Sequence, residues 1–400
     1  MTTADHPTTL PTKRANPFDP PLELAGLRAH SPICRLRYPD GHLGWLITGY
    51  DLARKVLADP RFSARSELKR VPVARRSLDP FYGAEALPGW LVDMDPPQHT
   101  RIRRRLARAF TVHRMRSLRP RIEEVVAEHV TAMAAAGDPC DFVESFALPI
   151  PSLVISELLG VPYSQRGDFQ RNSATMFSLT ATAEQAARAV ADLEAILAEL
   201  AAHKARQPGE DLLSVLAVDG ELSIPEIAGV GTLLLSAGHE TTAGSLSLGV
   251  FALLSHPDQR SRLVADPTLA DTAVEELLRY LTIFHFGVPR SPLEDVTLAG
   301  ETVRAGESVT VSLPAANRDP ERFPDPDRLD VGRNSAGHLA FGHGMHQCIG
   351  QNLARLEMRV AFPALFHRFP RLRLAVPSEQ ILLGEDTGFY CAHRLPVAWS

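Results

Sequence analysis

One cysteine near the C-terminal end lies in a sequence suited to holding a thiolate against a ligand. Three glycines, an aromatic ring and two histidines surround this thiol in the run Phe341-Gly342-His343-Gly344-Met345-His346-Gln347-Cys348-Ile349-Gly350. Glycines let a backbone approach a large flat ligand closely. A helix starting at Cys348 would direct free N–H groups at the sulfur and favour the thiolate. Such a thiolate is an axial ligand of haem in enzymes that cleave O–O bonds. The alternative is a buried structural cysteine after a glycine-rich turn.

A second polar group interrupts an apolar segment, residues 227–254, in the run Ala237-Gly238-His239-Glu240-Thr241-Thr242. A glutamate beside two β-branched hydroxyl residues is a poor helix interior, and such local conflicts are expected at functional sites. The alternative is a threonine bonded to the carbonyl four residues earlier, beside a solvent-facing glutamate. Because ionisable residues at mid-segment would be costly in a bilayer, we predict a buried central helix rather than a membrane span.

Helical periodicity dominates the chain that must position these groups. The sequence predicts helices over Pro21–His30, Tyr50–Ala58, His99–Ala109, Met115–Ala136, Pro151–Leu159, Ser164–Ser178, Ala183–Ala205, Ser223–Leu254, Pro257–Asp266, Leu269–Tyr280 and Gln351–Phe369. Strands are expected in two patches, first at Ile33–Tyr38 and Gly44–Ile47, and then at Val296–Leu298, Val303 and Ser308–Leu313. A long coil joins Ala315 to His338. We therefore predict a mainly α fold, with one large helical domain over 21–400, a smaller β-rich lobe and a flexible segment over 1–20.

Composition narrows the class of protein. The chain has 400 residues, a formal net charge of −5 and four widely spaced cysteines. Nucleic acid is therefore not an expected partner, and the cysteines indicate no disulfide framework but a reducing cytosol. With no secretory segment and no membrane anchor expected, we predict a cytoplasmic monomer.

The cysteine run resembles the haem-binding signature of the cytochrome P450 family. The resemblance covers about residues 33–399, and Ala316-Asn317-Arg318-Asp319-Pro320 and Leu353-Ala354-Arg355-Leu356-Glu357 also look like segments of soluble actinomycete members. It implies a haem-thiolate monooxygenase with haem b, held by Cys348 and bordered by Phe341, Gly342 and Gly350. Thr241 would hydrogen-bond the oxygen being activated, Glu240 would help to relay protons to it, and Ala237 and Gly238 would face the haem.

The same resemblance implies roles for charged residues. His99, Arg103, Arg290 and His346 would bind the two haem propionates, because buried carboxylates require cations. Glu276 and Arg279 would tie the long coil through a further arginine, with Arg328 the first candidate and Arg333 the second. As a pattern alone, this glutamate and arginine could equally be a solvated pair on a helix face.

The resemblance also implies partners. A hydrophobic small molecule and O2 would be the substrates, for hydroxylation or epoxidation in antibiotic and other secondary-metabolite tailoring or in broad xenobiotic or steroid oxidation. The segments Leu68–Val92 and Met176–Leu179 should line the pocket, with expected contacts from Trp90, Met176, Leu234, Ala237, Phe284, Val288 and Phe389.

Electrons would come from a ferredoxin and an NAD(P)H-dependent ferredoxin reductase, because the chain has no dinucleotide fingerprint. Four arginines, Arg101, Arg104, Arg105 and Arg108, would form either a docking face for that acidic donor or a solvated face. The alternative functions are a peroxide-using haem-thiolate protein or one that binds without turnover.

Overall fold

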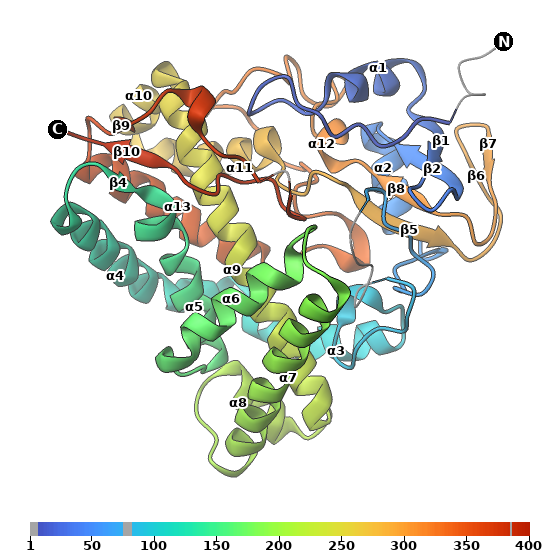
Figure 1. Ribbon diagram of the computed structural model, residues 1–400, viewed down its shortest axis with the longest axis horizontal. Helices are drawn as coiled ribbons and strands as arrows, with labels where there is room; N and C mark the ends of the chain where they lie inside the picture. Colours follow the sequence, from blue (N-terminus) through green and yellow to red (C-terminus); the bar gives the residue numbers. More distant parts are fainter. Residues whose placement is uncertain (1–6, 75–81, 385) are drawn as a thin grey trace.

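The computed structural model describes residues 7–74, 82–384 and 386–400. One long helix, α9 (Ile224–Ser255), crosses the middle of the molecule, with helices around it and the strands of the largest sheet to one side (Figure 1). A capping box closes its first turn, because Ser223 Oγ accepts the N–H of Glu226 while the Glu226 carboxylate accepts the N–H of Ser223. Small and apolar residues on all its faces let other helices pack around it. Among the described residues, no helix combines the length and apolarity of a membrane span.

The helices predicted from periodicity are present, with ends shifted by a few residues at most. Besides α9 they are α1 (Leu22–His30), α2 (Tyr50–Ala58), α3 (Gln98–Ala107), α4 (Val112–Ala136), α5 (Pro149–Leu159), α6 (Arg166–Phe177), α7 (Ala183–Arg206), α10 (Pro257–Ala265), α11 (Ala270–Leu281) and α13 (Gln351–Arg368). Two short helices, α8 (Leu212–Asp219) and α12 (Leu313–Ala316), were not predicted. Each has too few turns to show a hydrophobic period.

The last strand of the second predicted patch joins the first patch in one sheet. Its order is β1 (Ile33–Arg37), β2 (Leu43–Ile47), β8 (Val309–Val311), β5 (Val288–Pro292) and β3 (Phe62–Ser63). β2 and β8 run parallel, with Trp45 opposite Val309, so segments far apart in the sequence lie side by side. Smaller sheets pair β6 (Val296–Leu298) with β7 (Glu301–Val303), and β10 (Pro396–Ala398) with β4 (Cys140–Asp141) and β9 (Arg373–Leu374). The predicted fold class, mainly helical with a smaller β-rich lobe, is confirmed.

The N-terminal segment differs from the prediction in the part that the structure describes, which begins at residue 7. Leu10 and Phe18 are buried in hydrophobic clusters, and Asp19 pairs with Arg318 at 3.2 Å. The Arg14 guanidinium lies 3.8 Å from the centre of the Tyr390 ring. A polar, proline-rich sequence gave no periodic signal of this packing, so these contacts were not predicted. The flexibility of residues 1–20 stays a prediction, and residues 1–6 lie outside the described chain.

Candidate active site

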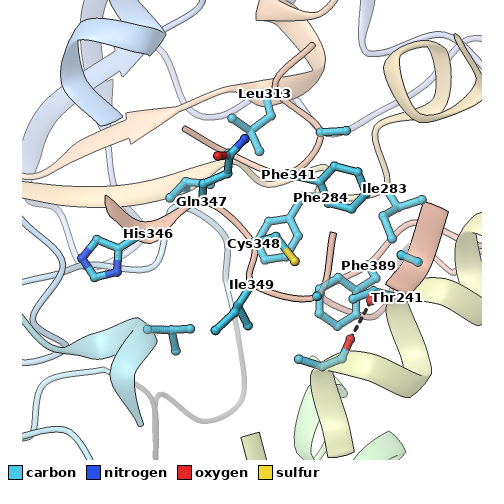
Figure 2. A pocket seen from close by; sticks show the side chains of 18 of the residues that line it. Thr241, Ile283, Phe284, Leu313, Phe341, His346, Gln347, Cys348, Ile349 and Phe389 are labelled. Carbon is cyan, nitrogen blue, oxygen red and sulfur yellow. Dashed lines mark hydrogen bonds between the residues drawn. The ribbon is translucent and has the colours of Figure 1, made fainter. Parts of the chain in front are cut away.

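A cavity of about 460 Å³ lies between α9 and the loop that carries Cys348. Cys348 and Thr241 both line it, from these two elements, and Figure 2 shows the cysteine sulfur and the threonine hydroxyl in the same pocket. Much of the remaining lining is apolar, with side chains from α9, α11 and the segment that leads into β5. The structure thus brings together the two motifs that the sequence keeps about a hundred residues apart.

The cysteine loop is shaped by backbone contacts. The Cys348 N–H donates to the carbonyl of Phe341 at 2.9 Å, which closes the loop. Gly344 has a φ of 74°, and a Cβ there would lie 2.4 Å from the Leu57 carbonyl oxygen at the end of α2. Only glycine allows both this conformation and this approach.

The helix after the cysteine, α13, begins at Gln351, as its periodicity predicts, and therefore three residues after Cys348 rather than at it. The backbone N–H groups of Gly350 and Gln351 still donate to the sulfur. Burial nevertheless raises the pKa of the Cys348 thiol above its usual value, against the lowering effect of these bonds and of the charges of Arg103 and Arg355. The bonds and charges of the loop thus favour the thiolate, as the sequence predicts, while burial of the sulfur opposes them. Coordination to a metal ion deprotonates a thiol outright.

The part of α9 beside the cavity carries the predicted hydroxyl. Thr241 Oγ1 donates to the Ala237 carbonyl at 2.6 Å, the local bond that the sequence left open as an alternative. Ala237, Gly238 and Thr241 all line the cavity. A Cβ on Gly238 would lie 3.0 Å from Ile155 of α5, so the missing side chain makes room for a neighbouring helix as well as for the cavity.

Glu240 is not among the residues that line the cavity. Burial raises the pKa of its carboxyl to about 7, and the charge of His393 opposes this effect. The same carboxylate helps to raise the pKa of the Cys391 thiol, after burial, to about 12. Glu240 therefore faces the C-terminal segment around 391–393, on another side of α9 from the cavity. Its proton is available near neutral pH, which suits an acid that passes protons on.

Four nitrogen-bearing side chains converge at the edge of the cavity, and they fit the propionates of a haem. His99, Arg103, Arg290 and His346 all line the cavity, and the His99 and His346 rings lie 4.3 Å apart. Burial, then Arg290 and His99, lower the pKa of His346 to about 2, and burial lowers the pKa of Arg290 to about 10.

Among the described residues, no carboxylate forms an ion pair with a member of this cluster. Neither ring nitrogen of His99 has a hydrogen-bond partner among the described residues. Arg290 donates to the carbonyl of Pro289. Asp95 and Asp93 act on Arg290 from a distance, but Asp95 accepts from Ser63 and Ala64 and Asp93 is paired with Lys69. Buried cations without a matching anion are costly, so two carboxylates of a bound group would complete this cluster.

The glutamate–arginine pair of α11 anchors the coil that leads to Cys348. Arg279 and Glu276 are fully buried and bonded at 2.7 Å between Arg279 Nε and Glu276 Oε2. The third member is Arg333, whose Nε donates to Glu276 Oε1 at 3.1 Å. Arg328, the first candidate, instead bonds Asp330, with 68% of its side chain exposed. The prediction of Arg328 was wrong, because the coil has no period from which side-chain direction could be inferred.

The wall of the cavity away from the cysteine is apolar. Phe389 meets Phe177 and Phe284 edge to face, with ring centres 4.8 and 5.1 Å apart. Of the predicted pocket residues, the cavity is lined by Trp90, Leu234, Ala237, Phe284, Val288 and Phe389. Met176 is not among the lining residues, because it is fully buried and its neighbour Phe177 takes its place. Part of the predicted Leu68–Val92 segment, residues 75–81, lies outside the described chain.

Two charged contacts near the site were missed. Lys69 and Asp93, both in the cavity lining, form a buried ion pair. Glu275 binds His338, Arg355 and Arg359. The only sequence signal for Glu275 was its place beside Glu276 in a pair of carboxylates.

Comparisons with known proteins agree with this geometry. A family model described as cytochrome P450 matches residues 198–375. Cytochrome P450 105C1 from a Streptomyces species is 48% identical, over 98% of this chain and 99% of that protein. Cytochrome P450 monooxygenase PikC from Streptomyces venezuelae is 46% identical, over 95% and 91%. The crystal structure of CYP105P1 in complex with filipin I superposes with a TM-score of 0.93 at 42% identity, covering 99% of each chain.

The fold and the cysteine-lined cavity define a haem-thiolate monooxygenase. The chain belongs to the cytochrome P450 family, and Streptomyces members of this family match it over nearly its whole length. Members of this family bind haem through a cysteine thiolate, and Cys348, which lines the cavity, would be the residue that holds it here. When bound, a haem ligated in this way supplies the electron density that favours cleavage of the O–O bond.

Proposed function

We propose that this monooxygenase inserts one oxygen atom from O2 into a hydrophobic small molecule, by hydroxylation or epoxidation, in secondary-metabolite tailoring or broad xenobiotic or steroid oxidation. The observation that carries the proposal is the cavity itself, in which Cys348 and Thr241 share a space walled by Phe177, Phe284 and Phe389. Aromatic walls with few polar groups favour apolar ligands, which gain free energy by leaving water.

A screen of hydrophobic compounds tests this proposal through the Soret band of the haem-loaded protein. We expect some terpenoid, steroid, macrolide or polyketide compounds to shift the band, and Phe389→Ala to weaken their binding about tenfold or more, because a large buried ring is lost. Val218→Ala on α8, a position 63% exposed, is the matched control and should bind as the parent does. If only gases and small polar ligands shift the band, a binding protein without turnover becomes the better conclusion.

Proton delivery is the part of the proposal that Glu240 and Thr241 support. The Glu240 carboxyl, with its pKa raised by burial to about 7, holds a proton that it can release near neutral pH. Thr241 Oγ1 donates its proton to Ala237 O, and Thr241 lines the cavity. We infer that the hydroxyl exchanges this local bond for one to a cavity ligand, since a helix tolerates loss of such a side-chain bond.

The chain's exposed arginines support a separate electron donor, a ferredoxin reduced by an NAD(P)H-dependent reductase. Arg101 and Arg105 are occupied, by Glu226 and by Asp219 and Glu221 respectively. Arg104 and Arg108 are exposed, and no ion pair to them is present among the described residues. Free cations on one surface attract an acidic partner in a salt-dependent manner.

Reversing the charges of Arg104 and Arg108 can distinguish an effect on electron supply from an effect on the oxygen chemistry. We expect Arg104→Glu with Arg108→Glu to slow reduction by a ferredoxin about tenfold and to flatten its salt dependence, because the long-range attraction is lost. Peroxide-driven turnover should be unchanged. Arg171→Glu on α6, also an exposed arginine, is the control and should leave both activities intact. An equal loss of both activities in the double variant would show that these arginines support the fold instead.

A further inference from the structure

Glu275 of α11 holds an arginine that reaches the cysteine loop. Its Oε1 accepts from Arg355 Nε at 2.6 Å and its Oε2 accepts from Arg355 Nη2 at 3.0 Å. The two side chains are 20% and 18% exposed. Oε2 also lies 3.0 Å from His338 Nε2, and Arg359 Nη2 donates to Oε1 at 3.3 Å. A two-point carboxylate–guanidinium contact fixes the direction of the arginine as well as its position.

Arg355 makes its other contacts with both ends of the loop around Cys348. Its guanidinium carbon lies 4.5 Å from the centre of the Phe341 ring, and its Nη1 donates to Gln351 Oε1 at 2.9 Å. Phe341 is the residue whose carbonyl accepts the Cys348 N–H, and Gln351 is one of the two residues whose N–H bonds the sulfur. Figure 2 shows Phe341 beside Cys348 in the pocket.

A second arginine approaches the same loop from α3, and the two differ in their partners. Arg103 Nη2 donates to the Gln347 carbonyl at 2.6 Å, and no carboxylate ion pair to Arg103 is present in the described parts of the chain. Arg355 is matched by Glu275. The charges of both arginines act on the Cys348 sulfur, but the charge of Arg355 is offset by the carboxylate that orients it.

We propose that Glu275 and Arg355 form a positioning pair that sets the one-electron reduction potential of the Cys348-ligated haem. The step concerned adds one electron, supplied by an external donor of the ferredoxin class, and neither forms nor breaks a bond at these residues. It adds one negative charge near the sulfur, so the guanidinium of Arg355 favours the reduced state and the carboxylate of Glu275 opposes it. Arg355 and Glu275 therefore shift the reduction potential in opposite directions.

A purely structural ion pair makes a different prediction. If Glu275 and Arg355 only hold α11 against α13, removing either charge loosens the loop in the same way, and both variants move the potential in one direction. If the pair acts through charge, Arg355→Gln and Glu275→Gln move the potential in opposite directions. Glutamine is the right replacement for Glu275, because its amide oxygen can still accept from Arg355 Nε and keep the arginine in place.

The experiment is a spectroelectrochemical titration of the haem-loaded protein with small chemical mediators, without any partner protein or substrate. For Arg355→Gln we expect the ratio of reduced to oxidised haem at a fixed potential to fall about tenfold, or about 59 mV for a one-electron couple. Arg355→Lys, which keeps the charge but loses the two-point contact, should lower this ratio by a smaller factor. Glu275→Gln should raise the ratio.

Arg359→Gln is the matched control, because Arg359 shares Glu275 and also binds Asp271 at 2.9 Å, but within the described chain it has no hydrogen bond or ion pair to residues 341–351. It should change the ratio of reduced to oxidised haem less than about twofold, since its side chain is 31% exposed and its charge is screened by solvent and salt. The carbon monoxide complex of every variant should keep the red-shifted Soret band of thiolate ligation. Shifts of the same sign in the two glutamine variants, or a loss as large in Arg355→Lys as in Arg355→Gln, would overturn the proposal. Should Arg355→Gln fail to retain haem, the sign of the Glu275→Gln shift decides the question alone.

Discussion

The two walls of the cavity are built by different kinds of interaction. On the cysteine side, the loop is tied to α11, α13 and the preceding coil by buried ion pairs, among them Glu276 with Arg279 and Arg333. On the substrate side, Phe177, Phe284 and Phe389 meet through ring contacts. Hydrogen-bonded charges demand one geometry, whereas apolar contact is non-directional. On the cysteine side of the cavity (the cysteine wall), the positions of individual atoms are therefore fixed. On the substrate side (the substrate wall), only the shape and the apolar character are fixed.

The largest expected effect comes from breaking the cysteine wall at the sulfur. Cys348→Ser should lose the red-shifted Soret band of the carbon monoxide complex completely, because a hydroxyl does not replace the thiolate. The reduced absorbance spectrum under carbon monoxide measures this. Retention of the band would mean that Cys34, Cys140 or Cys391 supplies the ligand.

Removing one charge from the buried network should be nearly as severe. Glu276→Gln should lower the free energy of unfolding by about 3–5 kcal/mol, because it leaves Arg279 buried without its carboxylate. Thermal or urea unfolding measures the change. Arg328→Gln, on the same coil but exposed, should change stability by less than about 0.5 kcal/mol. If the two variants lost similar amounts of stability, the buried ion pairs would not be what stabilises the cysteine side of the cavity.

A milder change at the boundary of the two walls should alter the outcome of the reaction rather than the fold. Thr241→Ala should bind haem and substrate, yet yield about tenfold less product per electron pair, with the remainder recovered as hydrogen peroxide, because a positioned proton donor is lost. Product and peroxide are measured against NAD(P)H consumed. Thr241→Ser, which keeps the hydroxyl, is the control. Unchanged coupling in the alanine variant would remove Thr241 from proton delivery.

The smallest expected effect is the pH dependence that Glu240 imposes. Its pKa of about 7 in the folded protein lies above the ordinary value of 4.5. Between these pH values the folded state holds a proton that the unfolded state has released, so stability should fall as pH rises from about 4.5 to 7. The parent should lose about 1–3 kcal/mol more than Glu240→Gln over this range. Urea unfolding at several pH values measures the difference, and parallel curves would contradict the raised pKa.

The sequence could predict features that are set by neighbouring residues, but not contacts between residues far apart in the chain. The cysteine loop and the Glu240–Thr241 segment are local, so their residue types and spacing, with the family resemblance that they carry, located the chemical groups. The partner of Glu276 lies in a coil without periodicity, so Arg328 and Arg333 could not be told apart until their directions were known. The pairing of β2 with β8 joins segments about 260 residues apart, and no local pattern specifies such a pairing.

The contact between Gly238 and Ile155 bears on how this enzyme can be redesigned. A Cβ at Gly238 would lie 3.0 Å from the Ile155 side chain, so Ile155 would have to shift to accept any side chain there. Libraries aimed at new substrates should therefore leave Gly238 unchanged, while Leu234 and Phe389, which face the cavity from α9 and the C-terminal segment, are open to variation. Only a paired change that shortens Ile155 would make Gly238 a usable site for diversification.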